Sequence, residues 1–309
     1  MSPSAIRLQA QQASESFVTS KVQFLADVNL WPGRQVLDPR GWLKNFLEPE
    51  RPHALALLGA FMYLNNPMVD ALFRSAVQRL SVEISQPTTS LAGAKLRWRA
   101  FLSSVRVTYV EGERPNVTDS GRIFARKARQ ELGIEESQIV DPAMALSELQ
   151  RNPSHSVLLV DDFVGSGDQM VTTWGRPYTT SLGNVSTFAE AALNGANIIY
   201  APLFATSRGI ASLSMRCQGL RVSPAHVLDA SYSLTDAESI LWPTALKATA
   251  ATMLYDASVR AGIVTNYKYG WQGFNDLALA IAFEHSVPDA TMPIFFWDRD
   301  GWIPLIRRT

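Results

Sequence analysis

Apolar positions recur along the chain with two spacings, and these predict alternating helices and strands. Between Met68 and Ile84 they follow the three- and four-residue spacing of an amphipathic helix. Val157–Val160 is a short continuous apolar run, which is typical of a buried strand. Similar patterns predict further helices at 4–26, 53–64, 119–132, 141–150, 167–174, 185–193, 206–217 and 235–261, and further strands at 103–110, 197–202 and 221–228.

The order of these elements indicates the fold class. From residue 103 onward, predicted strands alternate with predicted helices, which favours a parallel sheet with crossover helices. We therefore expect an α/β protein with a helical N-terminal region at 1–95, a parallel-sheet core at 96–232, and a C-terminal helix with a hood-like α+β addition at 233–309. In such sheets ligands bind beyond the carboxyl ends of the strands.

The residues after the strand 157–160 carry the main candidate chemistry. Two acids and a glycine turn lead into a predicted helix: Asp161, Asp162, Phe163, Val164, Gly165, Ser166, Gly167, Asp168 and Gln169. Adjacent carboxylates can accept hydrogen bonds from ribose hydroxyls or hold a hydrated Mg²⁺ ion. The free N–H groups of the turn and the first helical turn can hold an anion. The segment is therefore suited to a ligand that combines a sugar with a phosphate.

This segment resembles the phosphoribosyl pyrophosphate motif of type I phosphoribosyltransferases: four apolar residues, two acids, two apolar residues and a phosphate loop. The resemblance implies a phosphoribosyltransferase-like core in which Asp161 and Asp162 are catalytic, contact the ribose hydroxyls and position Mg²⁺ through water. It also implies that Gly165, Ser166 and Gly167 form the loop that binds the 5′-phosphate.

The loop departs from that motif directly after Gly167. The usual loop has Thr or Ser there, whereas this chain has Asp168 and Gln169 within the predicted ligand loop. The repulsion between an acid and a phosphate dianion ~4 Å apart would cost a few kcal/mol at an effective dielectric constant of about 20. The alternative is that Asp168 is an acid in the first turn of a helix, which the macrodipole favours by roughly 0.3–1 kcal/mol.

A second candidate region follows the first strand of the predicted core. Thr118, Ser120 and Gly121 lie in the turn after that strand, which in the superfamily helps to bind pyrophosphate. Arg122 is next to the turn, and two further arginines follow it at helical spacing. They could form the cationic side of a pyrophosphate pocket. The alternative is a solvated helix face.

The end of the chain narrows the resemblance. Over residues 45–309 the chain resembles PRTase-CE, a divergent phosphoribosyltransferase-like family of bacterial conflict systems. Three segments carry this resemblance: the acidic motif, Thr118–Gly121 and Glu284–Trp297. That family is associated with anti-phage loci, including some retrons. The resemblance implies a Mg²⁺-assisted ribose-phosphate site, for phosphoribosyl pyrophosphate or a nucleotide, in a nucleotide-targeting component of anti-phage defence.

Three functions remain open at this point. The first is an enzyme that acts at C1 of a ribose phosphate, either as a phosphoribosyltransferase or by cleaving a nucleotide. The second is a non-catalytic nucleotide sensor that relays occupancy to a partner. The third is a scaffold subunit in a defence complex with a protein or nucleoprotein partner. The sequence is also compatible with a homo-oligomer.

Composition bears on the partners and the cellular compartment of the protein. The 309 residues are 47% hydrophobic, enough for a sizeable core, and the zero net charge favours neither nucleic acid nor an anionic membrane as a general partner. Cys217 is the sole cysteine and cannot form an internal disulfide, which fits a reducing compartment. The apolar run 54–64 is shorter than the ~20 residues that span a bilayer, and the N-terminus lacks a secretory pattern. We therefore expect a cytoplasmic protein without a membrane partner.

Overall fold

The computed structural model describes residues 3–86, 90–112 and 120–308, and only the backbone of residues 3–14 and 120. The chain forms two compact units, Met1–Asn66 with Asp229–Thr309, and Pro67–Leu228. We refer to them as the first and the second unit. The unit boundaries lie at 66/67 and 228/229, whereas the sequence places its boundaries at 95/96 and 232/233, and that three-part division stays a prediction.

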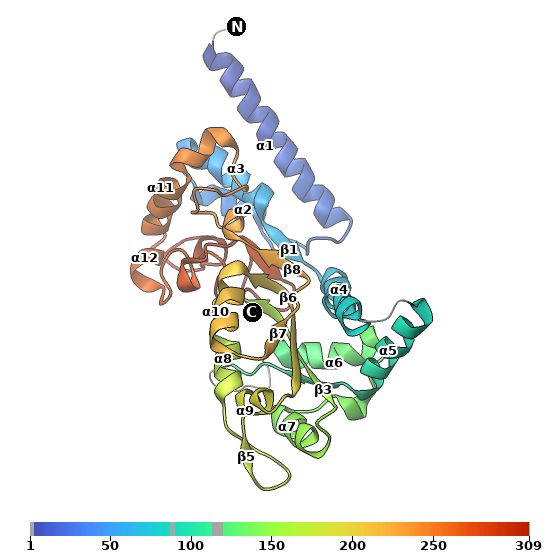
Figure 1. Ribbon diagram of the computed structural model, residues 1–309. Helices are drawn as coiled ribbons and strands as arrows, with labels where there is room; N and C mark the ends of the chain where they lie inside the picture. Colours follow the sequence, from blue (N-terminus) through green and yellow to red (C-terminus); the bar gives the residue numbers. More distant parts are fainter. Residues whose placement is uncertain (1–2, 87–89, 113–119, 309) are drawn as a thin grey trace. The chain divides into compact units, whose positions relative to one another are not determined.

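The second unit contains the predicted parallel sheet (Figure 1). Its strands run in the order β2-β3-β6-β7, with β8 pairing the far end of β6, and all pair in parallel. Their bounds are β2 Arg106–Tyr109, β3 Ser156–Val164, β6 Asn197–Thr206, β7 Leu220–Val222 and β8 His226–Leu228. The central strands β3 and β6 are almost continuously buried, as expected where helices cover both faces of a parallel sheet.

The helices α4 Asn66–Ile84 and α5 Leu91–Ser104 precede these strands. The helices between the strands are α6 Ser120–Leu132, η3 Glu136–Gln138, α7 Pro142–Arg151, α8 Asp168–Gly175, α9 Phe188–Leu193 and α10 Ser207–Arg216. In Figure 1, α8 and α10 lie to the left of the sheet and α4, α5 and α6 to the right. Side chains of α7, α8, α9 and α10 share one core cluster with Leu159 of β3 and Tyr200 of β6. On α6, Phe124 packs edge-on against Phe73 of α4. The mixed α/β class is thus confirmed.

The first unit joins segments from both ends of the chain. Its strand β1 Met62–Leu64 pairs in parallel with β9 Ile281–Phe283, next to which Glu284 accepts a 2.7 Å hydrogen bond from the N–H of Asn66. Its helices are α1 Pro3–Asp27, α2 Pro39–Trp42, η1 Leu43–Asn45, η2 Glu48–Glu50, α3 Arg51–Ala60, η4 Ala230–Tyr232, α11 Thr244–Arg260, α12 Ile263–Asn266, η5 Phe274–Asp276 and η6 Pro293–Phe295.

Aromatic side chains form much of the core of the first unit. The Trp42 ring stacks on Phe295 with a centroid distance of 5.7 Å, and Trp302 packs edge-on against Phe46. Both Trp42 and Trp302 donate their indole N–H to the carbonyl oxygen of Ile294. Buried indoles usually need such a partner, so the aromatic-rich ending has a packing role within this unit.

Several predicted elements differ from the observed ones. The helix predicted at 53–64 ends at Ala60 and is followed by β1, and 185–193 splits into β5 Val185–Ser186 and α9. The strand β5 forms an antiparallel hairpin with β4 Tyr178–Thr179. The strand predicted at 103–110 is shorter because α5 continues to Ser104.

The helix predicted at 235–261 begins nine positions later, at Thr244. The side chain of Asp236 accepts the backbone N–H of Glu238, a local turn that competes with helix formation. Pro243 then precedes the first helical residue, because proline is tolerated at a helix start but not in its interior. None of the described helices combines the length and apolar character needed to cross a bilayer.

Candidate functional site

The acid pair lies within strand β3, which corrects the prediction that the strand ends before Asp161. The β2–β3 ladder stops at Tyr109 opposite Val160, but β6 continues to pair β3 through Val164 opposite Ala205. The two acids therefore begin where β3 extends past β2, at the carboxyl end of the sheet. Successive side chains of a strand point to opposite faces, so the two carboxylates of the pair diverge.

Asp161 is buried and held by donors of its own unit. The hydroxyl of Tyr200 donates to Oδ2 at 3.1 Å, and the N–H of Asp162 donates to Oδ1 at 3.0 Å. Complete burial, followed by the charge of Asp161, raises the pKa of Tyr200 well above its usual value. The phenol therefore stays protonated and remains a donor that fixes the position of the Asp161 carboxylate.

Asp162 belongs to the opposite face of the sheet, which it shares with Val160 and its paired residue Tyr109. The guanidinium carbon of Arg122 lies 4.6 Å from the centre of the Tyr109 ring, a cation–π geometry. Among the described residues, the buried Nε of Arg122 has no hydrogen-bond partner. The predicted cationic residue and one acid of the pair thus belong to the same face of the sheet.

The start of α6 packs tightly on the end of β2. A Cβ atom on Gly121 would lie 2.9 Å from the carbonyl oxygen of Val110 and 2.9 Å from the Cβ of Tyr109. Glycine is therefore needed for packing here, whatever its role toward a ligand. Of the other residues predicted in this turn, Thr118 lies outside the described residues, and Ser120 is described only as the first backbone position of α6.

Beyond Arg122, the basic side chains of α6 have structural surroundings. Lys127 pairs with Asp70 of α4, and Arg129 pairs with Glu136 at 2.8 Å on the surface. Arg126 is exposed. The observed arrangement favours the solvated face for these outer charges.

The predicted phosphate loop is a tight turn between β3 and α8. Gly167 has a φ of +86°, which L side chains rarely adopt, and it immediately precedes α8. The hydroxyl of Thr206 donates to the carbonyl oxygen of Gly165 at 2.6 Å, and a Cβ on Gly209 would lie 2.4 Å from the same oxygen. Close packing of α10 therefore fixes the path of the loop.

Asp168 makes specific contacts at the beginning of α8. Its Oδ2 accepts the hydroxyl of Ser166 at 2.8 Å, and its Oδ1 accepts a guanidinium N–H of Arg216 at 2.7 Å. Gln169 is exposed. The location of Asp168 in the first helical turn fits the structural alternative, and Arg216 supplies a cation beside it that the sequence did not indicate.

A hydrogen-bonded cluster around Glu111, which the sequence did not indicate, anchors the segment after β2. Oε2 of the buried Glu111 accepts hydrogen bonds from Arg176 at 2.8 Å and from Tyr178 at 2.9 Å. Thr173 of α8 exchanges two further bonds with the main chain of Glu111. Burial, followed by the charge of Glu111, raises the pKa of Tyr178. The chain entering the predicted pyrophosphate turn is thereby tied to the helix that follows the acid pair.

Among the described residues, no group of three or more His, Cys, Asp or Glu side chains is arranged to hold a metal ion. Mg²⁺ usually keeps several waters and is held by one or two carboxylates together with substrate phosphates. Because the two carboxylates of the acid pair diverge, a single one of them together with the phosphates of a ligand would satisfy that weaker requirement. A Mg²⁺ ion held through water at Asp161 and Asp162 thus stays a prediction that requires a phosphorylated ligand.

The chain was compared with curated proteins, solved structures and family models. No curated protein matches the chain. A solved structure described as a hypothetical protein from Neisseria gonorrhoeae with bound ppGpp is similar at 12% identity and a TM-score of 0.28, over 55% of this chain and 85% of that one. A family model described as PRTase-CE matches residues 39–308, which include both candidate regions. The chain therefore belongs to the PRTase-CE family.

Proposed function

We propose that the protein binds a phosphorylated ribose, either phosphoribosyl pyrophosphate or a nucleotide, at the carboxyl end of β3. The observation that supports this most is the continuity of the site: the buried acids Asp161 and Asp162 lead directly into a rigid turn at the start of α8. Carboxylates suit the ribose hydroxyls, and the beginning of a helix suits a phosphate. Family membership is consistent with this ligand class.

Each residue has a defined role in the proposed enzyme. Asp162 accepts hydrogen bonds from the ribose hydroxyls, and Asp161, held by Tyr200, places a second negative charge near the sugar. With phosphoribosyl pyrophosphate as substrate, Arg122 binds the leaving pyrophosphate from the α6 side, and a nucleobase forms the new bond at C1. With a nucleotide as substrate, the nucleobase leaves and water forms the new bond. Cleavage at C1 develops positive charge on the sugar ring, which nearby carboxylates stabilise. A Mg²⁺ ion, held by the phosphates of the ligand and through water by the acid pair, would neutralise charge on the leaving group.

A nucleotide sensor without turnover is the second candidate. Both oxygens of Asp161 accept hydrogen bonds from the protein, and Ser166 donates its hydroxyl to Asp168. Such internal bonds reduce the number of groups that can change partners during a reaction. For both candidates, we propose that the protein is a nucleotide-targeting component of an anti-phage system. If the protein were instead a scaffold in a defence complex, this site would have no ligand.

Isothermal titration of phosphoribosyl pyrophosphate with Mg²⁺ tests the site. We expect binding to the wild type, loss of binding in Asp162→Asn, and no change in Asp256→Asn, which removes an exposed acid on α11. Equal binding by wild type and Asp162→Asn would exclude the acid pair as the ribose site. Pyrophosphate release in the presence of nucleobases then separates an enzyme from a sensor, and intact anti-phage activity of an Asp161→Asn/Asp162→Asn variant would favour the scaffold.

A further inference from the structure

One face of α10 follows the path of the predicted phosphate loop. Positions four and three residues apart on this helix contact the loop in chain order: Gly209 lies against Gly165, Leu213 against Gly167, and Arg216 against Asp168. Residues at this spacing lie on the same side of a helix. The guanidinium of Arg216 is therefore brought to the end of the loop by the same face that packs against its glycines.

The hydroxyl of the loop is already engaged within the protein. Ser166 donates to Oδ2 of Asp168 at 2.8 Å and accepts the N–H of Asp168 at 3.3 Å. In the motif that this loop resembles, hydroxyls after the glycine bind the 5′-phosphate. A phosphate bound here therefore needs a side-chain donor from another element, in addition to the backbone N–H groups of the turn.

Arg216 has the capacity to supply that donor. One of its N–H groups binds Asp168, whereas a guanidinium carries five N–H donors in a planar fork that suits phosphate. Its side chain is 49% exposed and that of Asp168 is 44% exposed, so a ligand in solvent can reach both. The positive charge of Arg216 offsets the negative charge of Asp168. A phosphate dianion at the loop is therefore not simply repelled by the carboxylate, because the guanidinium beside it attracts the phosphate.

We propose that Arg216, oriented by Asp168, binds the 5′-phosphate of the ligand and takes the place of the loop hydroxyls. The inference rests on the proposed function, because it assigns a residue to that ribose-phosphate site. It also assigns a specificity: the contact of Arg216 makes the site prefer a 5′-phosphorylated ribose to the same sugar without phosphate. Asp168 is then a positioning residue for the guanidinium.

A competing explanation is that Arg216 only neutralises Asp168, as in an ordinary surface ion pair. Under both explanations Arg216→Gln weakens phosphate binding, because it leaves the Asp168 carboxylate without its guanidinium partner. A double-mutant cycle separates them, since Asp168→Asn removes the charge but keeps an oxygen that can orient Arg216. Any effect of Arg216→Gln in the Asp168→Asn background must then come from the ligand.

The test is an NMR titration of ribose 5-phosphate, with ribose as the matched probe, into wild type, Asp168→Asn, Arg216→Gln and the double variant. We expect Asp168→Asn to bind ribose 5-phosphate at least as tightly as wild type, and the double variant to bind about tenfold to a hundredfold more weakly than Asp168→Asn. Binding of ribose should be the same in all four proteins.

Equal affinity of Asp168→Asn and the double variant for ribose 5-phosphate would overturn the inference. If wild type still bound ribose 5-phosphate and Asp162→Asn did not, the proposed function would survive that result. If neither wild type nor Asp168→Asn bound the sugar phosphate, both the proposed function and the role of Arg216 would fail. Thermal unfolding of each variant checks that it folds.

Discussion

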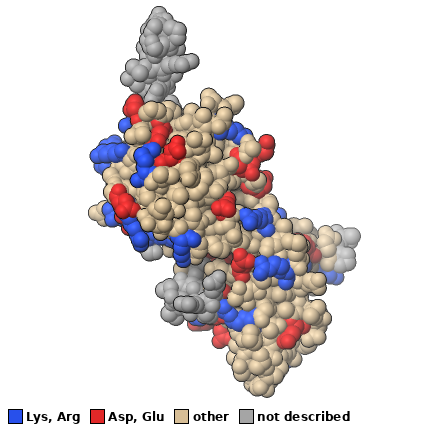
Figure 2. Space-filling view, turned by 90° about the vertical axis from the view of Figure 1, so that its left-hand side faces the viewer, with Lys and Arg blue, Asp and Glu red and all other residues tan. Residues whose placement is uncertain are grey.

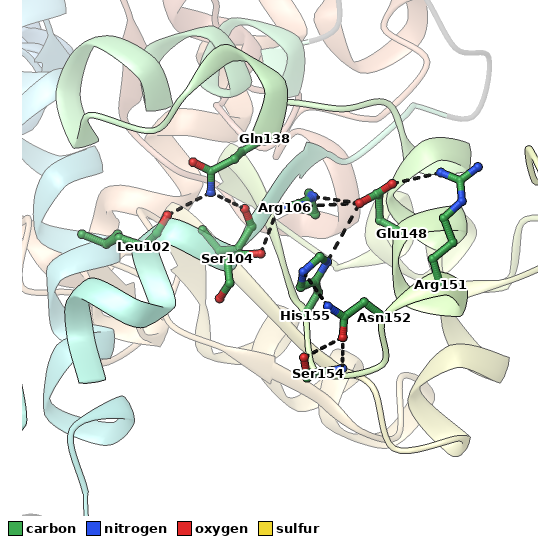
Figure 3. Close-up of polar contacts among 10 residues, drawn as sticks. Leu102, Ser104, Arg106, Gln138, Glu148, Arg151, Asn152, Ser154 and His155 are labelled. Carbon is green, nitrogen blue, oxygen red and sulfur yellow. Dashed lines mark hydrogen bonds and ion pairs between the residues drawn. The ribbon is translucent and has the colours of Figure 1, made fainter. Parts of the chain in front are cut away.

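The two ends of the parallel sheet in the second unit place carboxylates in different surroundings. At the end where β2 and β3 begin, Glu148 of α7 lies among three basic side chains (Figure 3). Arg106 approaches it at 3.2 Å, Arg151 at 3.0 Å and His155 at 4.0 Å. Burial opposes ionisation, but hydrogen bonds from Arg151 and Arg106 outweigh it and hold the pKa of Glu148 below its usual value.

At the end where β3 stops, Asp161 accepts hydrogen bonds from a phenol and a backbone N–H. The helices α6, α8 and α10 begin at this end, immediately after or packed on the ends of β2, β3 and β6. At the other end, α7 finishes with Arg151. Helix N-termini favour anions and helix C-termini favour cations, so the starts of these helices favour negative charge at one end of the sheet, and the end of α7 favours the positive charge of Arg151 at the other.

This contrast explains why residue type alone does not identify the site. Glu148 and Arg106 are as polar as Asp161 and Arg122, but the first pair satisfies itself across adjacent elements. On the face shown in Figure 2, acidic and basic side chains are likewise interspersed, in keeping with the zero net charge. What distinguishes the carboxyl end is a tight turn that leads from the buried acids directly into the first turn of α8.

The largest expected effect comes from Gly209→Ala at the carboxyl end of the sheet. The added Cβ would lie 2.4 Å from the carbonyl oxygen of Gly165, which is main chain and cannot rotate away. We expect the free energy of unfolding to fall by about 1–3 kcal/mol, with weaker binding of ribose 5-phosphate. Urea unfolding measures the first and NMR titration the second.

Gly175→Ala is the matched control for that change. Gly175 ends α8 in the same unit, and a Cβ added to it would have no neighbouring atom within 4 Å. We expect a change in unfolding free energy of no more than about 0.5–1 kcal/mol, and in the stabilising direction. Equal losses in the two variants would show that the packing of α10 against the loop has no special role.

The next effect concerns the phenol that holds Asp161. Tyr200→Phe removes the hydrogen bond to Oδ2 and leaves a buried carboxylate with one fewer donor, which should cost about 1–2 kcal/mol of unfolding free energy. Tyr178→Phe is the control, because Arg176 still donates to Oε2 of Glu111 after the change. Urea unfolding should show a smaller loss for Tyr178→Phe, and the reverse order would contradict this account of Asp161.

Local patterns sufficed to predict the core of the second unit. The apolar run at Val157–Val160 and the alternation of elements predicted the parallel sheet, and the helix predicted at 141–150 is α7, which begins with Pro142 directly after Asp141. The side chain of Asp141 accepts the N–H of Met144, as an N-cap residue does. Such signals depend on residues a few positions apart, which is why they can be read from one sequence.

The remaining features depend on contacts between distant residues. The strand β3 continues through the acids because β6 offers partners as far as Ala205, and nothing near Asp161 signals this. Arg216 reaches Asp168 from the far end of α10, and Glu111 finds Arg176 on another helix end. Sequence patterns singled out the acid pair and the loop as candidates, but they indicated neither the continuation of β3 through the acids nor the side chains that orient them.

The smallest expected effect belongs to His155, at the end of the sheet with the internal ion pairs. Burial, then the charge of Arg106, lowers the pKa of His155 from its usual 6.5, and Glu148 only partly offsets this. The side-chain nitrogen of Asn152 lies 3.0 Å from Nε2, which suits a neutral ring that accepts there. The folded protein therefore binds this proton less readily than the unfolded chain does.

It follows that the contribution of His155 to stability is complete above pH 6.5 and declines as the pH falls below that value toward its lowered pKa. The contribution of Glu148 is lost only at lower pH, as the pH falls below 4.5, so the two windows separate. Urea unfolding at pH 7.5 and pH 5.5 should show a loss of at most about 1 kcal/mol in wild type and a smaller one in His155→Gln. If wild type and His155→Gln lost the same unfolding free energy between pH 7.5 and pH 5.5, His155 would not contribute to the pH dependence of stability in this range.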